Sequence, residues 1–172
     1  MSSQLSTRVL FQQEISAALG VSEQDLRTKY DDPAISLQII EPEKVGSVVA
    51  PWPDILNWDY AKKRATIFHR SCFVGVSTGA SANIAALALV KVSKHRVTTS
   101  LLFLQKDDDA GLPPGRAMAM MDIVLESIAA VFESTTIAID TPVDDDLVTY
   151  YKGYGYTTEK RLDGRLLLTK PA

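Results

Sequence analysis

The sequence is poor in the residues that build disulfide frameworks and metal clusters. Its 172 residues include one cysteine, Cys72, and two histidines, His69 and His95. A single cysteine excludes an intramolecular disulfide and any zinc cluster built on several cysteines. So few histidines leave little for a histidine-rich metal site. No stretch approaches the ~18 uninterrupted apolar residues of a membrane-spanning helix, and we therefore expect no membrane partner.

A strong charge of one sign is also lacking. Lysine and arginine number 18 against 21 acidic residues, for a formal net charge of −3 at pH 7. Such a chain has no bulk attraction for nucleic acid or anionic lipid, and we expect no nucleic-acid partner. Hydrophobic residues make up 46% and charged residues 23% of the chain, as in globular proteins. The start lacks the pattern of a signal peptide, which predicts a cytoplasmic protein.

Hydrophobic spacing at the N-terminus predicts two short helices. The first covers residues 6–19 and ends at Gly20, and the second covers residues 22–30 and ends before a proline. We interpret residues 1–33 as an N-terminal helical extension, dispensable for the sheet core, and residues 34–172 as the main domain. The extension carries an apolar face that we predict to support a homodimer; its members are Val9, Phe11, Ile15 and Leu19.

The main domain alternates strand and helix patterns. A strongly apolar segment over residues 116–132 predicts a helix buried against a sheet, and Asp163-Gly164 favours a tight hairpin turn. A loop with two prolines is expected over residues 46–53. The other predicted elements are helices over 54–69 and 144–152, and strands over 35–40, 72–76, 84–92, 97–105, 135–140, 156–161 and 166–170.

Three short patterns have little support as functional motifs. The segment 75–79 reads G-x-S-x-G, but no acidic residue separates Ser77 from His95, as a hydrolase triad would need. The segment 152–156 matches half of an RNA-recognition signature, and too few residues follow it to complete that fold. The aspartate runs 107–109 and 144–146 lack the spacing of a calcium loop, and we expect no metal site.

The most informative pattern is a loop of small residues in front of the apolar helix. It reads Leu112-Pro113-Pro114-Gly115-Arg116-Ala117 and follows the strand predicted over 97–105. Glycine and alanine let backbone N–H groups approach a ligand closely. The helix N-terminus adds a partial positive charge, so this loop suits a pyrophosphate group.

Together with the C-terminal elements, this loop resembles the GNAT superfamily of N-acyltransferases. The acyl-CoA loop of that family reads Q/R-x-x-G-x-G/A, and Gly115 and Ala117 fall on its last two positions. The penultimate helix of the family ends in a pattern matched by Tyr150-Tyr151-Lys152-Gly153-Tyr154-Gly155-Tyr156. The resemblance rests on motifs over residues 97–172 and on element order over residues 34–96.

The resemblance implies an α/β fold with a mixed, mostly antiparallel central sheet flanked by helices. The sheet should splay between the strands at 97–105 and 135–140. It implies transfer of an acyl group, most simply acetyl, from acyl-CoA to an amine acceptor. Acetyl-CoA would be bound by the backbone of Leu102, Phe103 and Leu104, along its pantetheine arm, and by the loop formed by Leu112, Pro113, Pro114, Gly115, Arg116 and Ala117.

The same resemblance gives Tyr151 the role of proton donor to the departing thiolate. Backbone N–H near Leu102 would stabilise the oxyanion. Leu112 stands where the family has Gln or Arg, and residues 98–102 offer no glutamate as a base. The alternative is a catalytically silent GNAT-fold module that docks a partner protein through residues 1–33. Binding of acetyl-CoA distinguishes the two.

Overall fold

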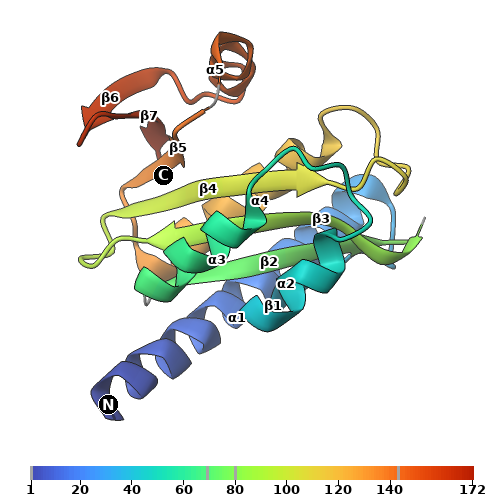
Figure 1. Ribbon diagram of the computed structural model, residues 1–172, viewed down its shortest axis with the longest axis horizontal. Coiled ribbons are helices and arrows are strands. Elements are labelled where there is room, and N and C mark those ends of the chain that lie inside the picture. Colours follow the sequence, from blue (N-terminus) through green and yellow to red (C-terminus); the bar gives the residue numbers. More distant parts are fainter. Residues whose placement is uncertain (1, 69, 80, 143) are drawn as a thin grey trace.

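The computed structural model describes residues 2–68, 70–79, 81–142 and 144–172. Within these residues, one seven-stranded sheet is covered by helices on both faces (Figure 1). The helices are α1 (Ser2–Tyr30), α2 (Pro42–Val49), α3 (Trp58–Ile67), α4 (Arg116–Phe132) and α5 (Asp145–Lys152). The strands are β1 (Ser36–Ile40), β2 (Ser71–Thr78), β3 (Ser81–Val92), β4 (Thr98–Lys106), β5 (Thr136–Asp140), β6 (Thr158–Leu162) and β7 (Arg165–Pro171).

The sheet is mixed and mostly antiparallel, as predicted. Its strand order is β1-β2-β3-β4-β5-β7-β6, and only β4 and β5 run parallel. These two strands pair only from Thr98 to Leu101 on β4, opposite Thr136 to Ile139 on β5. Because β4 continues to Lys106, its second half has no strand beside it on the β5 side. This is the splay that the resemblance implies.

Several local predictions are confirmed in detail. The bounds of α4 are the predicted ones, Arg116–Phe132. Asp163 and Gly164 have φ angles of 51° and 77°, and positive values at both positions are what a type I′ hairpin turn between β6 and β7 requires. Asp144 caps α5, because its carboxylate accepts a hydrogen bond from the Leu147 N–H at 2.8 Å.

Two other predictions are wrong. Residues 46–53, predicted as a loop, begin inside helix α2, where Pro42 occupies the first turn and Val45 is buried. The two prolines of the predicted loop, Pro51 and Pro53, do follow the helix, and Pro42 in its first turn loses no helical hydrogen bond. Residues 6–30 form a single helix without a break at Gly20. A helical glycine costs only about 1 kcal/mol, which burial of the neighbouring Leu19 and of Leu26 offsets.

Two apolar layers hold the sheet between its helices. Helices α1 and α4 cover one face, and α2 and α3 lie in front of the other (Figure 1). Alternation along β3 supplies both layers. Ala86 and Ala88 belong to the layer under α1 and α4, whereas Leu87 and Leu89 belong to the layer under α2 and α3.

The body of the protein covers most of the apolar face of α1. Phe11 and Ile15 are buried, and the Phe11 ring centre lies 5.4 Å from that of Phe132 in α4. This packing argues against a dispensable extension, although the boundary at residue 33 stays a prediction. Val9 and Leu10 remain 50% and 58% exposed, so the predicted homodimer would use these two side chains.

The structure also bears on membrane-spanning helices, metal-binding groups and cysteine reactivity. Every helix in the described ranges is too short or too polar to cross a lipid bilayer. Those ranges contain no group of three or more His, Cys, Asp or Glu side chains placed around a metal. His69 lies outside the described residues, and His95 is exposed. Cys72 is buried in β2, and burial raises the pKa of its thiol to about 12, which makes it unreactive.

Candidate active site

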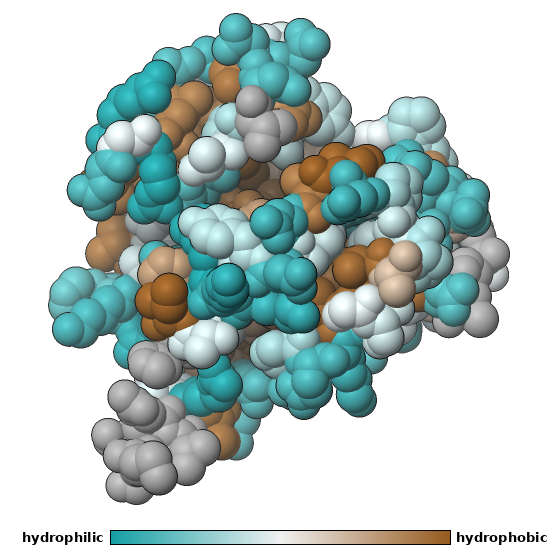
Figure 2. All heavy atoms as spheres, viewed as in Figure 1, coloured by the Kyte–Doolittle hydropathy of each residue, from teal (hydrophilic) through white to brown (hydrophobic). Residues whose placement is uncertain are grey.

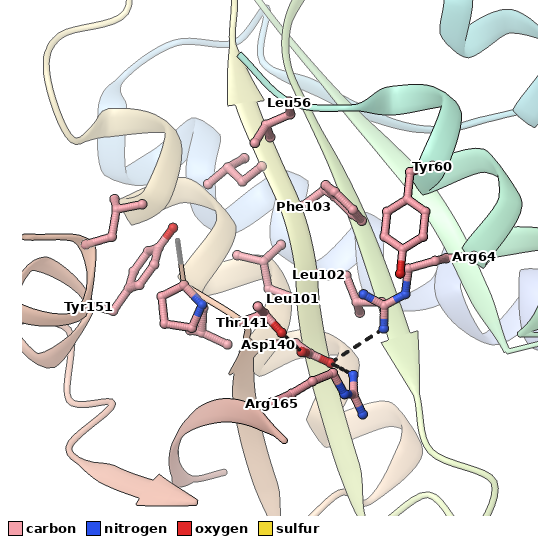
Figure 3. A pocket seen from close by; sticks show the side chains of 14 residues that line it. Leu56, Tyr60, Arg64, Leu101, Leu102, Phe103, Asp140, Thr141, Tyr151 and Arg165 are labelled. Carbon is pink, nitrogen blue, oxygen red and sulfur yellow. Dashed lines mark hydrogen bonds and ion pairs between the residues drawn. The ribbon is translucent and has the colours of Figure 1, made fainter. Parts of the chain in front are cut away.

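A cleft of about 420 Å³ lies where β4 and β5 separate. It is lined by Leu101 to Leu104 on β4, by Ile139 and Asp140 at the end of β5, and by Thr141 and Pro142 after that strand. Tyr151 of α5 lines one side, and Tyr60 and Arg64 of α3 line the other. In the space-filling view, hydrophobic atoms lie in a hollow beside the C-terminal elements (Figure 2). The side chains that line the cleft are drawn in Figure 3.

A β-bulge at Leu102 shapes the floor of the cleft. Phe103 pairs with Leu89 of β3 and Leu101 pairs with Val90, so Leu102 is the extra residue between them. The parallel pairing with β5 ends at Leu101. The backbone of Leu102 therefore has no partner residue in either neighbouring strand. Bulges of this kind turn backbone groups out of the ladder and are common beside active sites.

The β4 edge beyond the bulge is free to bind an extended ligand. Leu102, Phe103 and Leu104 all line the cleft, and no strand of the described chain pairs with them on the β5 side. An exposed strand edge of this type accepts main-chain hydrogen bonds from another extended chain. The amides of a pantetheine arm can make such bonds.

Tyr151 faces the same cleft from α5 (Figure 3). Burial raises the pKa of its phenol above the ordinary value, and the negative charge of Asp144 adds to the effect. The hydroxyl is therefore protonated at neutral pH and can donate a proton. Tyr151 thus shares one cavity with Leu102, Phe103 and Leu104, although α5 and β4 are distant in sequence.

The loop before α4 has the backbone geometry of an anion cradle. Gly115 caps the helix with a φ of 78°, in the left-handed region that favours glycine. The Arg116 N–H bonds back to the Pro113 carbonyl at 3.1 Å. The next two N–H groups, of Ala117 and Met118, donate to no residue that the structure describes. Unpaired N–H groups in a first helical turn suit a phosphate group.

Two tyrosines from the end of α5 lie over this loop. The Tyr154 hydroxyl donates to the Gly115 carbonyl at 3.2 Å, and it lies 3.4 Å from the Tyr150 hydroxyl. A Cβ atom at Gly115 would lie 3.3 Å from the Tyr150 hydroxyl, closer than most real contacts. The glycine is therefore needed both for its φ angle and for space. That these two tyrosines lie over the loop was not predicted from the sequence.

The remaining predicted residues of the loop have different surroundings. Pro113 and Pro114 are exposed, and Leu112 is partly buried against the main core. The Arg116 guanidinium lies 4.0 Å from the centre of the Tyr30 ring of α1. The Arg116 side chain thus contacts α1, and its backbone N–H is already paired with the Pro113 carbonyl.

A charged cluster at the end of β5 was not predicted from the sequence. Asp140 is buried, and the Arg165 Nη1 donates to its Oδ2 at 2.6 Å. The Arg64 Nη2 lies 3.7 Å from the same oxygen, and the Thr141 hydroxyl donates to Oδ1 at 2.5 Å. Thr141 has a φ of 53°, which is strained for a β-branched residue and is found mostly at functional sites.

Helix α3 is fixed to β4 beside the cleft. The Trp58 indole N–H donates to the Gln105 side-chain oxygen at 2.8 Å, and the Gln105 amide donates to the Pro53 carbonyl at 2.8 Å. The Trp58 ring also lies 5.9 Å from that of Phe103. Because Gln105 is buried, these bonds satisfy its polar atoms and hold α3 in a defined position.

Comparisons with known proteins identify the fold. Neither a protein-family model nor a curated protein sequence matches this chain. Among solved structures, an acetyltransferase from Thermus thermophilus matches with a TM-score of 0.58 and 11% identity, over 81% of this chain and 97% of that one. The ribosomal-protein-S18-alanine N-acetyltransferase from Escherichia coli matches with a TM-score of 0.56 and 13% identity, over 80% and 93%.

A GNAT-family acetyltransferase from Listeria monocytogenes has a TM-score of 0.56 and 12% identity, over 80% of this chain and 95% of that chain. At these identities the likeness is one of fold. The chain has the GNAT fold, with a long N-terminal helix added before its first strand.

Proposed function

We propose that the protein transfers an acyl group, acetyl in the simplest case, from acyl-CoA to an amine. The observation that carries the proposal is the cleft between β4 and β5. The free edge of Leu102 to Leu104 and the Tyr151 side chain line this one cavity. A strand edge that binds a pantetheine arm and a phenol that protonates a thiolate are what transfer from a thioester requires.

The donor would be held at two places. Its pantetheine amides would pair with the backbone of Leu102 to Leu104 as an added strand. Its pyrophosphate would bind the free N–H groups of Ala117 and Met118 at the start of α4. Leu112 stands where the family has glutamine or arginine, so the backbone of the loop would supply the contacts to the phosphates.

The chemical step needs few groups from the protein. The amine nitrogen bonds to the acyl carbon while the carbon–sulfur bond breaks. The sulfur receives the phenolic proton of Tyr151, and solvent then returns a proton to the phenolate. The proton that the amine loses passes to water. Backbone N–H at the Leu102 bulge would stabilise the negative carbonyl oxygen of the transition state.

Asp140 is a poor candidate for the base that deprotonates the amine. It is the acidic residue among those that line the cleft, but Arg165 donates to its carboxylate at 2.6 Å. This bond occupies one carboxylate oxygen of Asp140, and the Thr141 hydroxyl donates to the other. Water is therefore the expected proton acceptor.

Binding and turnover of acetyl-CoA test the proposal. At 100 times its Kd, acetyl-CoA should stabilise the protein by about 2.7 kcal/mol in thermal denaturation, whereas ADP is the control for non-specific phosphate binding. With a mixture of amines, a thiol reagent should then detect released CoA. The background is low because Cys72 is buried. Absence of stabilisation by acetyl-CoA would count against the proposal.

The second candidate function is a GNAT-fold module that binds a partner without catalysis. Two features favour it: Leu112 replaces the polar residue of the family's acyl-CoA loop, and β4 carries no acidic residue. This candidate predicts neither stabilisation by acetyl-CoA nor release of CoA. If acetyl-CoA stabilised the protein but no CoA were released, the protein would bind the donor, and either the assay would lack the right acceptor or the protein would lack catalytic activity.

A further inference from the structure

Two arginines pair with one buried carboxylate on the side of the cleft away from Tyr151, and a lysine lies near enough to interact with all three electrostatically. Arg64 comes from α3, Arg165 from the start of β7 and Lys91 from β3, and Asp140 lies between the two arginines. Lys91 and Arg64 share the Phe68 ring, whose centre lies 3.8 Å from the Lys91 Nζ and 5.5 Å from the Arg64 Cζ.

The charges in this cluster do not balance. Asp140 supplies one negative charge against the three positive charges of its neighbours. Burial lowers the pKa of Lys91, and the positive charges of Arg165 and Arg64 lower it further, with partial compensation by Asp140. Crowded like charges are unfavourable, and a bound anion would relieve them.

The two guanidinium groups keep unused donors. Arg64 is 13% exposed, and its distance of 3.7 Å from Asp140 is too long for a hydrogen bond. Within the described part of the chain, Arg64 has no other polar partner, and Arg165 donates only to Asp140. An arginine offers five N–H donors in a planar fork that matches a carboxylate. Most of these donors are therefore available in the cleft.

The cluster lies where an acceptor can reach the acyl group. In Figure 3, Arg64 and Tyr60 lie on one side of β4, and Tyr151 lies on the other. Leu102 lies between them and carries the bulge that would hold the reacting carbonyl. An amine bound on the Arg64 side would approach the acyl carbon near Leu102 from the side opposite Tyr151, which protonates the leaving sulfur.

We propose that the acceptor is a small amine that also carries a carboxylate, which Arg64 and Arg165 bind. The inference rests on the proposed acyl transfer and names the acceptor class of that site. Here Asp140 positions two guanidinium groups and leaves their forks open toward the cavity.

The test uses a matched pair of product-like probes that need no donor. N-acetylglycine carries a carboxylate, and N-acetylglycinamide has the same size without the charge. Titration of each into the isotope-labelled protein, followed by NMR, gives the two Kd values. We expect the wild type to bind the acid at least tenfold more tightly than the amide, or about 1.4 kcal/mol. Equal binding, or binding of neither probe, would overturn the inference.

Variants then assign the preference to residues. Arg64→Gln should abolish the preference for the acid, and Arg165→Gln should reduce it. Arg161→Gln, at an exposed arginine of β6 outside the cleft, should keep it. Loss of the preference in Arg161→Gln, or its survival in both other variants, would contradict the proposed site.

The two proposals fail in different ways. Because the probes bind without acyl-CoA, a carboxylate preference in the wild type supports the anion site even if acetyl-CoA does not stabilise the protein. Stabilisation by acetyl-CoA together with equal binding of acid and amide would support donor binding and overturn the carboxylate-bearing acceptor.

Discussion

The Arg116 guanidinium lies 4.0 Å from the centre of the Tyr30 ring. This contact joins the end of α1 to the first residue of α4, next to the loop proposed to hold the phosphates. A cation over an aromatic ring stabilises by ~0.5–1 kcal/mol at an exposed site. The N-terminal helix therefore helps to fix the start of α4.

Removing this contact should loosen the proposed phosphate site. We expect Tyr30→Ala to weaken acetyl-CoA binding about two- to fivefold, the equivalent of the lost cation–π energy. Calorimetry measures the change, and Tyr30→Phe is the matched control because it keeps the ring. Tighter binding by Tyr30→Ala would show instead that the freed Arg116 reaches the phosphates itself.

Truncation inside α1 should destabilise the whole protein. Ile15 is fully buried in the main core, so Ile15→Ala should cost about 2–5 kcal/mol in urea denaturation. Leu10→Ala removes a similar side chain that is 58% exposed, and it should change stability by less than about 0.5 kcal/mol. Equal effects would mean that α1 does not belong to the cooperative core.

The glycine before α4 should be required for donor binding. Gly115→Val places a branched side chain at a positive φ angle and 3.3 Å from the Tyr150 hydroxyl. We expect acetyl-CoA to bind at least tenfold more weakly, or about 1.4 kcal/mol, by calorimetry. Gly164→Val is a matched control, since Gly164 has a φ of 77° and open space around it. Similar losses of affinity in both variants would indicate a general folding defect.

Tyr151 should be the tyrosine that matters for turnover. Tyr151→Phe removes only the hydroxyl, and loss of a general acid lowers the rate about 10²–10⁴-fold. Steady-state kinetics with a working acceptor should show this loss in kcat. Tyr150→Phe, at the preceding residue of the helix, is the control. Wild-type kcat in Tyr151→Phe, or a larger loss in Tyr150→Phe, would place the proton donor elsewhere.

Alkaline pH should destabilise the protein through Tyr156. Burial and a hydrogen bond of 2.7 Å to the Asp122 carboxylate raise the pKa of this phenol above its ordinary value of about 10. A raised pKa in the folded state stabilises the protein below pH ~10, and this stabilisation is lost progressively as the pH rises above that value.

Urea denaturation at several pH values measures this effect. Tyr156→Phe should be less stable at pH 8, because it loses a buried hydrogen bond, but its stability should fall less steeply between pH 9 and about 11. A fall as steep as in the wild type would assign the alkaline sensitivity to other groups.

Local patterns in the sequence predicted most elements because they depend on neighbouring residues. The apolar run of α4 and the Asp163-Gly164 turn are of this kind. Both errors arose where a single residue type was given more weight than the packing around it. Gly20 predicted a helix end, but a packed face that continues past it keeps α1 in one piece. Pro42 was not recognised as the first-turn residue of α2.

The cleft was predicted in outline and its charged end was not. The family resemblance named Tyr151 and the β4 backbone, and both line the cavity. Arg64, Asp140 and Arg165 come from three elements that only the tertiary fold brings together. No spacing rule links them in the sequence. The small net charge of −3 gives no sign of a local excess of positive charge.

The packing of α1 against α4 also sets an order for folding during translation. Phe11 is synthesised long before its partner Phe132, and at 5–20 residues per second the delay is on the order of ten seconds. During this time the part of α1 that packs on α4 has no partner in the growing chain, although β1 has already been made. The N-terminal helix can therefore reach its final packing only after α4 has been synthesised.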